Sequence, residues 1–367
     1  MDNELQFLWA ILKKATRPEE VFGILVGTVD ERLLQCTKSY RHIVGLAHPD
    51  HFSSDEDKAK ATETFKLLQP LYEQAQAKIK SGTYGDHSSG KPIEPVNITS
   101  KKNNYPLGEM RYSGSISDLF MSSMVNGSET EHLLIKVARN YKNNEFIKNE
   151  ATNLKTIFKD PGSLLALLPE CLDSFSIQEP TDKSIRQANV FHYQPDLVSM
   201  ETVIEKYSKG IDPRDMAWMF KRILAALFCA HEKGIIHGAV LPPHILLNLK
   251  NHGILLIDWA FSVGLEASHI KAIDSKYKEY YPKAVFEKKP PMPASDIYMT
   301  AMSMVKLLGG ELKTKTIPDT VPKSIRMLLR ACTLDPSGLD NAFEVHEEFK
   351  KTIGKLFGPP KFREFKI

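Results

Sequence analysis

Two stretches in the first part of the chain carry apolar side chains at helical spacing. Over residues 31–47, and again over residues 56–80, apolar positions recur on one face of a helix. They are Cys36, Tyr40, Ile43, Val44 and Ala47 in the first stretch, and Ala61, Phe65, Leu68, Tyr72, Ala75 and Ile79 in the second. Two such stripes predict an antiparallel helical hairpin. Because Pro70 lacks an N–H, we expect it to kink or locally unwind the second helix.

The tripeptide His48-Pro49-Asp50 separates the two helices. Pro49 disfavours a helical conformation for His48, so the first helix must end here. Lys38, Arg41 and His42 fall on the face opposite the apolar stripe. We therefore expect the tripeptide to project from a hairpin tip beside a basic patch. Taken alone, that patch is equally typical of an ordinary solvated helix face.

This segment resembles a J domain, the co-chaperone module of DnaJ-type proteins. The matching residues are Lys38-x-Tyr40-Arg41, His48-Pro49-Asp50 and Phe65-x-x-Leu68 with Tyr72, and the short stretch from Pro18 to Leu25 looks like the family's first helix. The resemblance implies that His48, Pro49 and Asp50, with Lys38, Arg41 and His42, dock on a DnaK-type heat-shock chaperone. It further implies that docking stimulates ATP hydrolysis by that chaperone.

Composition changes at residues 82–104, which are rich in Gly, Ser, Pro, Asn and Lys. Such a segment is typical of a flexible linker. The residues after it begin strand-like and end helical, with an amphipathic helix predicted over 216–231 and two short apolar strands on either side of a turn at 248–253. We expect a J domain with an N-terminal helix over 1–81, a linker over 82–104, a second domain over 105–355 and a tail over 356–367.

The second domain resembles a protein kinase. The segment from Gly234 to Leu247 looks like the catalytic loop, for which the family pattern is H-R-D-L-K-P-x-N-I-L, and Asp258-Trp259-Ala260 stands where the family has D-F-G. Other landmarks follow the family's chain order: a phosphate-covering hairpin with Gly114, a strand with Lys136, a helix with Glu150, and a helical segment with Ser295-Asp296. The implied fold class is multidomain, a small all-α J domain plus an α+β bilobal kinase-like domain.

Several positions depart from the kinase pattern in ways that remove chemistry. Ala239 stands where the family has the Asp that accepts the substrate proton, and loss of a general base costs about 10²–10⁴-fold in rate. His244 replaces the Asn that holds a second Mg²⁺, although Mg²⁺ prefers oxygen ligands. Only Gly114 remains of the three hairpin glycines. These losses indicate a pseudokinase with no catalytic residue in its loop.

Lys136, Glu150, Gly114 and Asp258 remain as a residual site for ATP with Mg²⁺, with Asp258 as the metal ligand. The alternative is an internal Lys136–Glu150 salt bridge with a purely structural role. We interpret His237, in the catalytic loop, as a packed residue rather than a base. A metal site formed by His244 and His252 with Asp258 is a less favoured alternative, because histidines near strands are more often structural.

Charge, cysteine content and the length of the apolar runs limit the partners and the kinds of fold that this protein can have. Lys plus Arg number 48 and Asp plus Glu 45, a net charge of +3 that gives no argument for nucleic acid or an anionic membrane as partner. The four cysteines lie far apart, which disfavours a disulfide scaffold or a zinc ribbon. No apolar run is long enough to span a bilayer. We expect a cytoplasmic protein.

Three functions follow from these patterns. The first is an adaptor in which the J domain recruits and stimulates a DnaK-type chaperone while the kinase-like domain docks an unknown client or partner or senses nucleotide. The second is an atypical Ser/Thr protein kinase that transfers phosphate from ATP with a non-standard loop. The third is a scaffold in which neither module keeps its ancestral role.

Overall fold

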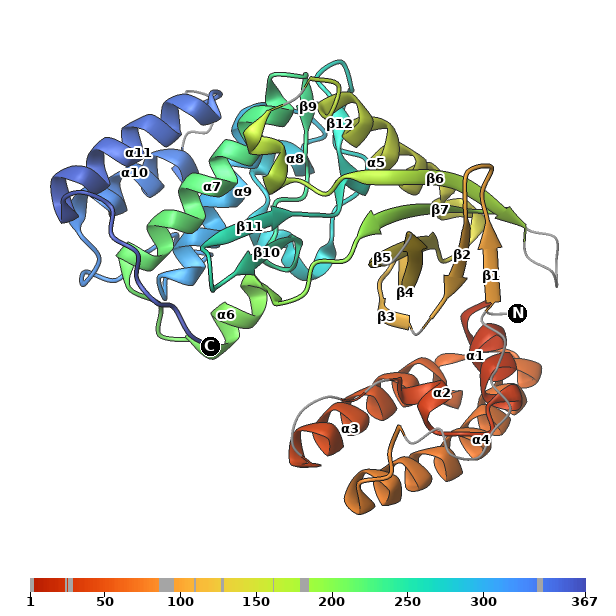
Figure 1. The fold of residues 1–367 in the computed structure, drawn as a ribbon. Helices are drawn as coiled ribbons and strands as arrows, with labels where there is room; N and C mark the ends of the chain where they lie inside the picture. The colour runs from red at the N-terminus through yellow and green to blue at the C-terminus, as the bar shows by residue number, and fades with distance from the viewer. Residues whose placement is uncertain are drawn as a thin grey trace. The chain divides into compact units, whose positions relative to one another are not determined.

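A computed structural model describes residues 3–23, 25, 29–85, 96–108, 110–126, 129–160, 162–178, 185–334 and 339–367. The chain forms two compact units. One comprises residues 1–97 with the short segments 106–113 and 120–122, and the other comprises 98–105, 114–119 and 123–367. The fold is mixed α+β, with helices in both units and several antiparallel sheets (Figure 1).

The helices of the first unit are drawn from red to orange in Figure 1. They are α1 (Asn3–Lys14), α2 (Glu19–Phe22), α3 (Val29–Leu46) and α4 (Asp55–Ser81), with a 3₁₀ turn η1 (Pro49–His51) between the last two. Helix α4 begins where Ser54 Oγ accepts a hydrogen bond from Asp57 N (3.1 Å), which satisfies an otherwise unpaired helix amide. Its stripe is buried against α3, as the pattern predicted, with Leu68 and Ala75 fully covered.

Helix α4 runs through Pro70 without interruption, so the expected unwinding is wrong. Leu68 and Leu71 on either side of the proline are buried in the core of this unit. Burying a leucine contributes about 1.5–3 kcal/mol. The free energy gained by burying these leucines is comparable in size with the cost of a proline inside a helix, which is about 3 kcal/mol.

Strand β1 (Val96–Thr99) lies inside the range 82–104 that composition marks as a linker, and it pairs with β2 (Asn104–Leu107), which begins at the end of that range. Residues 86–95 lie outside the described part of the chain. A five-stranded sheet follows, in the order β3-β4-β5-β7-β6. Its strands are β3 (Met110–Ser113), β4 (Ser117–Asn126), β5 (Glu129–Ala138), β6 (Cys171–Gln178) and β7 (Ile185–His192). Helix α5 (Asn144–Ile157) packs on β5, β6 and β7.

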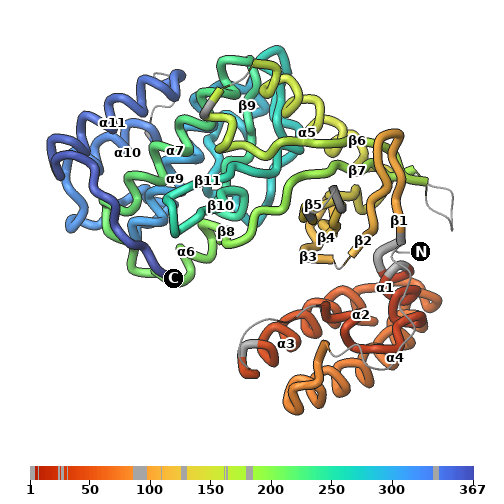
Figure 2. The backbone as a smooth tube through the Cα atoms, in the orientation of Figure 1, coloured from red at the N-terminus to blue at the C-terminus, as the bar shows by residue number. Residues whose placement is uncertain are grey.

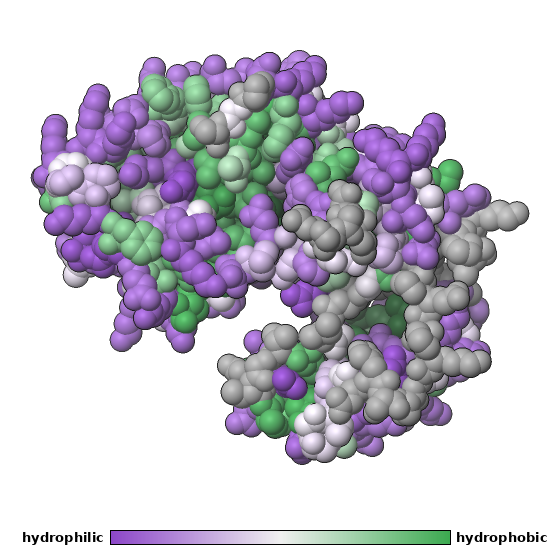
Figure 3. All heavy atoms as spheres, viewed as in Figure 1, coloured by the Kyte–Doolittle hydropathy of each residue, from purple (hydrophilic) through white to green (hydrophobic). Residues whose placement is uncertain are grey.

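The remainder of the second unit is mainly helical (Figure 2). Its longest helices are α7 (Pro213–His231), α9 (Pro293–Leu307), α10 (Lys323–Leu334) and α11 (Ala342–Phe357), and its shorter ones are α6 (Met200–Lys206) and α8 (Lys283–Phe286). Its strands are β8 (Leu197–Ser199), β9 (Ile235–Ile236), β10 (Ile245–Asn248), β11 (Gly253–Leu256) and β12 (Val263–Gly264). The apolar faces of α7 and α9 form the centre of the core. On the face shown in Figure 3, hydrophilic side chains cover much of the surface of this unit, and apolar side chains gather near its middle.

The last residues of the chain pack on the second unit. Phe365 is buried, and its ring lies 5.5 Å from that of Tyr207. Arg363 pairs with Asp215 of α7, with 3.1 Å between Nε and Oδ1. Helix α11 extends two residues beyond the boundary at 355 that sequence predicted. Among the described residues, no helix combines the length and apolarity that crossing a membrane requires.

Candidate functional site

The first candidate site is the loop between α3 and α4. His48 adopts an extended conformation, and Pro49 begins the turn η1 directly after it. His48 Nδ1 accepts a hydrogen bond from Asp50 N (3.3 Å), and His51 N donates to His48 O (3.0 Å). These bonds close the tripeptide into a compact turn. The Asp50 side chain is 87% exposed, and its Oδ2 lies 3.7 Å from His48 Nδ1.

Contacts between the two helices and contacts at the loop itself hold the hairpin together. Between α3 and α4, the rings of Tyr40 and Tyr72 stack with centroids 4.0 Å apart, and Tyr40 Oη donates to Gln69 Oε1 (2.6 Å). At the loop itself, Leu5 of α1 is buried with Ala47 and Ala61, and Phe52 packs against this cluster. Because Ala47 and Phe52 flank the tripeptide, α1 restrains both ends of the loop.

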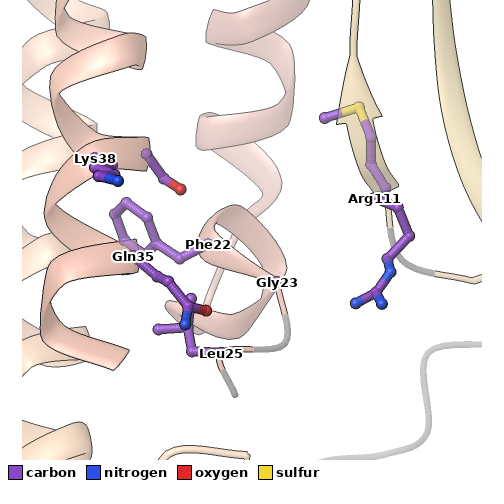
Figure 4. Close-up of a pocket in the computed structure, with 8 residues that line it drawn as sticks. Phe22, Gly23, Leu25, Gln35, Lys38 and Arg111 are labelled. Atoms are coloured by element: carbon purple, nitrogen blue, oxygen red, sulfur yellow. The ribbon is translucent and has the colours of Figure 1, made fainter. Parts of the chain in front are cut away.

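Lys38, Arg41 and His42 are all exposed on α3, where the sequence placed them. Figure 4 shows Lys38 and Gln35 on one side of α3, next to Phe22 of α2. These three residues of α2 and α3 contribute to the lining of a pocket. The exposed side chains of Lys38, Arg41 and His42 give α3 a basic face, and Asp50 places an exposed carboxylate at the tip of the hairpin. This is the arrangement expected from the sequence.

The second candidate site lies in the second unit, around Lys136 of β5. Lys136 Nζ is 2.9 Å from Glu150 Oε1 of α5 and 2.5 Å from Asp258 Oδ1, directly after β11. Glu150 is also held by Asn189 Nδ2, which donates to its other oxygen (3.2 Å). Only 8% of the Lys136 side chain and 2% of the Glu150 side chain are exposed. Three residues that are far apart in the sequence thus form one buried ion network.

The charges in this network shift each other's pKa. Burial lowers the pKa of Lys136, but the charges of Asp258 and Glu150 outweigh this effect and raise it above its usual value. Burial raises the pKa of Asp258, but the charges of Lys136 and His244 outweigh burial and bring that pKa to about 2. For Glu150, burial prevails over the charge of Lys136 and raises the pKa. Lys136 and Asp258 are therefore ionised at neutral pH.

His244 joins the network through Asp258. Its Nε2 lies 3.1 Å from Asp258 Oδ2, and its Nδ1 lies 2.8 Å from the carbonyl oxygen of Ala239. Each oxygen of the Asp258 carboxylate therefore has a nitrogen of this protein in contact. Among the described residues, no group of three or more His, Cys, Asp or Glu side chains is placed to hold a metal ion. This donor set does not fit the oxygen-rich coordination that Mg²⁺ requires.

Asp296 of α9 binds the backbone of the two residues that precede Ala239. Its carboxylate, fully buried, accepts hydrogen bonds from His237 N (2.8 Å) and Gly238 N (2.9 Å), and it contacts His231 Nε2 at 2.9 Å. The His237 ring is also satisfied on both sides, since Nδ1 accepts from Ala239 N (3.2 Å) and Nε2 donates to Ile257 O (3.0 Å).

Burial lowers the pKa of His237 to about 4, so the ring is neutral at neutral pH. Both of its nitrogens are engaged with backbone groups, and the side chain is wholly covered. This geometry agrees with the interpretation of His237 as a packed residue and offers no route to a substrate proton.

The pKa of another carboxyl group, that of Glu201 on α6, is influenced by the charge of His244. Glu201 Oε1 accepts hydrogen bonds from Tyr277 Oη (2.5 Å) and Lys276 Nζ (2.9 Å). Burial acts to raise the pKa of Glu201, but these hydrogen bonds outweigh it and lower the pKa below its usual value. A carboxylate held in this way is a weak base, so Glu201 is a poor substitute for the Asp missing at Ala239.

Not every predicted residue joins the network. Gly114 lies between β3 and β4, where its N–H donates to Ser117 O (2.9 Å) and its carbonyl accepts from Arg139 (3.0 Å). His252 stacks between Trp218 and Phe362 and hydrogen-bonds the Arg363 carbonyl (2.7 Å). The alternative metal site that combined His252 with Asp258 is therefore wrong. Binding of ATP stays a prediction, whereas the donors around Asp258 do not fit the Mg²⁺ that was expected with it.

Sequence reasoning missed a second link between α5 and the segment after Asp258. Asn149 Nδ2 donates to Ser262 O (2.7 Å), and Asn153 Nδ2 donates to Ser262 Oγ (2.8 Å). Two asparagines spaced i and i+4 on a helix share one face, which is the signal that could have revealed them. The sequence matches no protein-family model and no curated protein with significance.

Proposed function

We propose that this protein is a J-domain co-chaperone and adaptor that recruits a DnaK-type chaperone and stimulates its ATP hydrolysis. The observation that carries the proposal is the loop between α3 and α4. It presents the Asp50 carboxylate to solvent at the end of a hairpin with exposed Lys38 and Arg41. The basic side chains would attract an acidic surface on the chaperone and speed encounter, while the loop makes the specific contact.

In this proposal the second unit is a kinase-like domain without phosphoryl transfer, which docks a client or partner protein. Three features support the kinase-like assignment: the Lys136–Glu150 pair, Asp258 in a left-handed conformation (φ 65°), and the buried Asp296 that binds the backbone of the loop. The loop lacks a proton acceptor because Ala239 carries only a methyl group and is 1% exposed. The cytoplasmic location remains a prediction.

The decisive experiment measures single-turnover ATP hydrolysis by a purified DnaK-type chaperone in the presence of this protein. Wild type should stimulate hydrolysis, and Asp50→Asn should return it to the basal rate, because the substitution removes the charge without altering the buried hairpin. Asp55→Asn is the matched control, an exposed aspartate on the first turn of α4. It should stimulate like wild type. Absence of stimulation by wild type, or equal stimulation by Asp50→Asn, would refute the proposal.

A second candidate function is an atypical Ser/Thr kinase, which the intact Lys136–Glu150–Asp258 network favours. A phosphotransfer assay with labelled ATP and generic protein substrates distinguishes the two. We expect no label on the substrate above background. Label transferred by wild type but not by Lys136→Ala would establish the kinase and remove the non-catalytic assignment.

A further inference from the structure

Residues 359–367 form neither helix nor strand, and they pack on the second unit as an irregular tail. Figure 1 draws the tail in dark blue, from the end of α11 toward α6. Helix α11 ends where Gly358 takes a positive φ of 73°, and Pro359 and Pro360 follow. Because proline has no N–H, the helix cannot continue through this point. The tail is therefore a separate element that can change place without breaking the backbone ladder of α11.

Two side chains of the second unit contact the main chain of the tail. His252 Nε2, in the turn between β10 and β11, lies 2.7 Å from the carbonyl oxygen of Arg363. Tyr207 Oη, directly after α6, donates to the carbonyl oxygen of Lys366 (2.5 Å). Every residue has such a carbonyl, so these contacts hold a peptide backbone whatever its sequence. Peptide-recognition surfaces commonly combine main-chain contacts of this kind with contacts to individual side chains.

Arg363 supplies the charged contact. Its Nε donates to Asp215 Oδ1 (3.1 Å) and its Nη2 to Asp215 Oδ2 (3.3 Å), while Nη2 also lies 3.4 Å from Asp212 Oδ2. Asp212 caps the start of α7, and Asp215 belongs to its first turn. Two parallel N–H···O bonds to one carboxylate require the planar fork of donors that arginine has and lysine lacks. This contact therefore favours arginine at this position.

Aromatic side chains lie on either side of the arginine. The Phe362 ring stacks on that of His252 with centroids 4.5 Å apart, and His252 stacks in turn on Trp218 at 4.6 Å. The Phe365 ring is buried and lies 5.5 Å from that of Tyr207. The residue before Phe365 is exposed. The contacts therefore follow the order phenylalanine, arginine, any residue and phenylalanine.

The surface that receives these groups, here called the tail-binding surface, consists of Tyr207, Asp212, Asp215, Trp218 and His252. It holds the tail by few contacts. Phe365 is 8% exposed, but Phe362 is 66% exposed, and residues 361, 364, 366 and 367 are exposed as well. A segment with so little buried side-chain surface opens more easily than the core around α7 and α9.

We propose that the tail-binding surface is a docking site for a partner protein that carries phenylalanine, arginine, any residue and phenylalanine in this order. Residues 362–365 are then a self-ligand that the partner displaces. Arg214 pairs with Asp212, so the negative charge of Asp215 is left for the arginine of an incoming segment. This role rests on the partner docking proposed above for the second unit, and it is independent of chaperone docking.

The test measures binding of a fluorescent peptide, Lys-Phe-Arg-Glu-Phe-Lys, to the full chain by fluorescence anisotropy. The peptide repeats residues 361–366. In wild type the tethered tail competes at an effective concentration of about millimolar, so binding should be weak. In Arg363→Ala/Phe365→Ala the tail lacks its two main side-chain contacts, and the peptide should bind at least about tenfold more tightly. Asp215→Asn added to this variant should remove the gain.

Two controls accompany the test. Arg222→Ala/Phe343→Ala changes an exposed arginine and an exposed phenylalanine outside the tail-binding surface, and it should bind the peptide as wild type does. A peptide with lysine in place of arginine should bind Arg363→Ala/Phe365→Ala about tenfold more weakly, because it loses the paired contact with Asp215. Equal binding of the two peptides, or equal binding of the first peptide by wild type and Arg363→Ala/Phe365→Ala, would overturn the proposal.

A measurement on wild type holds even if that variant fails to fold. Excess unlabelled peptide should displace the tail, so the amide NMR signals of residues 361–367 should move toward those of a free chain. Unchanged signals at about 10 mM peptide, above the effective concentration of the tail, would contradict displacement. A wild-type dimer in light scattering that becomes a monomer in Arg363→Ala would show that a second copy supplies the tail, and would also overturn the proposal. Normal stimulation of the chaperone without peptide binding would reject this docking site alone.

Discussion

Replacing Lys136 by methionine should destabilise the second unit, whatever its effect on any activity. The methionine side chain would keep most of the apolar stem but lack the charge that lies 2.9 Å from Glu150 and 2.5 Å from Asp258. Two carboxylates would then remain in a buried region without the cation between them. Breaking a buried ion pair by removing one partner costs about 3–5 kcal/mol. That is a large share of a typical unfolding free energy of about 5–15 kcal/mol.

The structure also predicts how the pair responds to a second change. Glu150→Gln leaves Lys136 with Asp258 and should cost about 1–3 kcal/mol, since one hydrogen-bonded charge is lost. In Lys136→Met/Glu150→Gln only one carboxylate, that of Asp258, is left without Lys136, instead of two. The double variant should therefore cost less than the sum of the single ones, by about 0.5–3 kcal/mol. The exposed residue Lys142 provides the control, because Lys142→Met should stay within about 0.5 kcal/mol of wild type.

Urea unfolding followed by tryptophan fluorescence measures these differences. Trp259 reports on the site, since it is fully buried one residue after Asp258, with its ring centroid 4.5 Å from that of His237. A cost below about 1 kcal/mol for Lys136→Met, or strictly additive costs in the double variant, would show that the three residues do not form the network described.

Three further predictions follow from the same structure. Burial lowers the pKa of His237 to about 4, from a value near 6.5 in the unfolded chain. Between these two pH values the unfolded state binds a proton that the folded state does not bind. The free energy of unfolding should therefore fall by up to about 3 kcal/mol as the pH drops from about 6.5 to 4. Urea midpoints of wild type and His237→Gln measured across this range should converge on acidification, and parallel curves would contradict it. Leu5→Ala should lower the free energy of unfolding of the first unit by about 2–4 kcal/mol, measured in a thermal melt followed by circular dichroism. The control Leu34→Ala, at a residue that is 57% exposed, should lower it by less than about 0.5 kcal/mol. Equal losses of stability in the two variants would show that α1 does not brace the loop. Phe365→Ala should lower the urea midpoint of the second unit by the equivalent of about 3 kcal/mol. Phe362→Ala should lower the midpoint by less, because Phe362 is 66% exposed whereas Phe365 is 8% exposed. The reverse order would refute the packing of the tail.

Local features of the first unit were predictable because nearby residues determine them. The apolar stripes led to α3 and α4 within about two residues at each end, a common uncertainty of helix boundaries. Pro49 ended α3 by its own covalent geometry, and the exposed tip followed. The expectation of local unwinding failed at Pro70, because the net cost of a proline inside a helix depends on packing that the local pattern does not contain.

Residue types at separate positions indicated which groups the second site uses. Lys136, Glu150 and Asp258 were expected in one site because of the resemblance to a protein kinase. The structure brings them within hydrogen-bond distance of one another. Asn149 and Asn153 were missed, because their partners are backbone and hydroxyl groups of a segment more than a hundred residues away. The β1–β2 hairpin was missed because polar, glycine-rich composition is also compatible with short strands at a surface.

The amino-acid sequence by itself determined the helical hairpin, the exposed Asp50 at its tip and the loss of a proton acceptor at Ala239, since each depends on residue identity and short-range geometry. Only the tertiary structure decided what His244 does. In the sequence it is a substituted metal ligand, whereas in the fold it faces two acceptors, the Ala239 carbonyl and Asp258. Which groups meet the two ring nitrogens of a histidine depends on how the chain folds, and no local pattern specifies them.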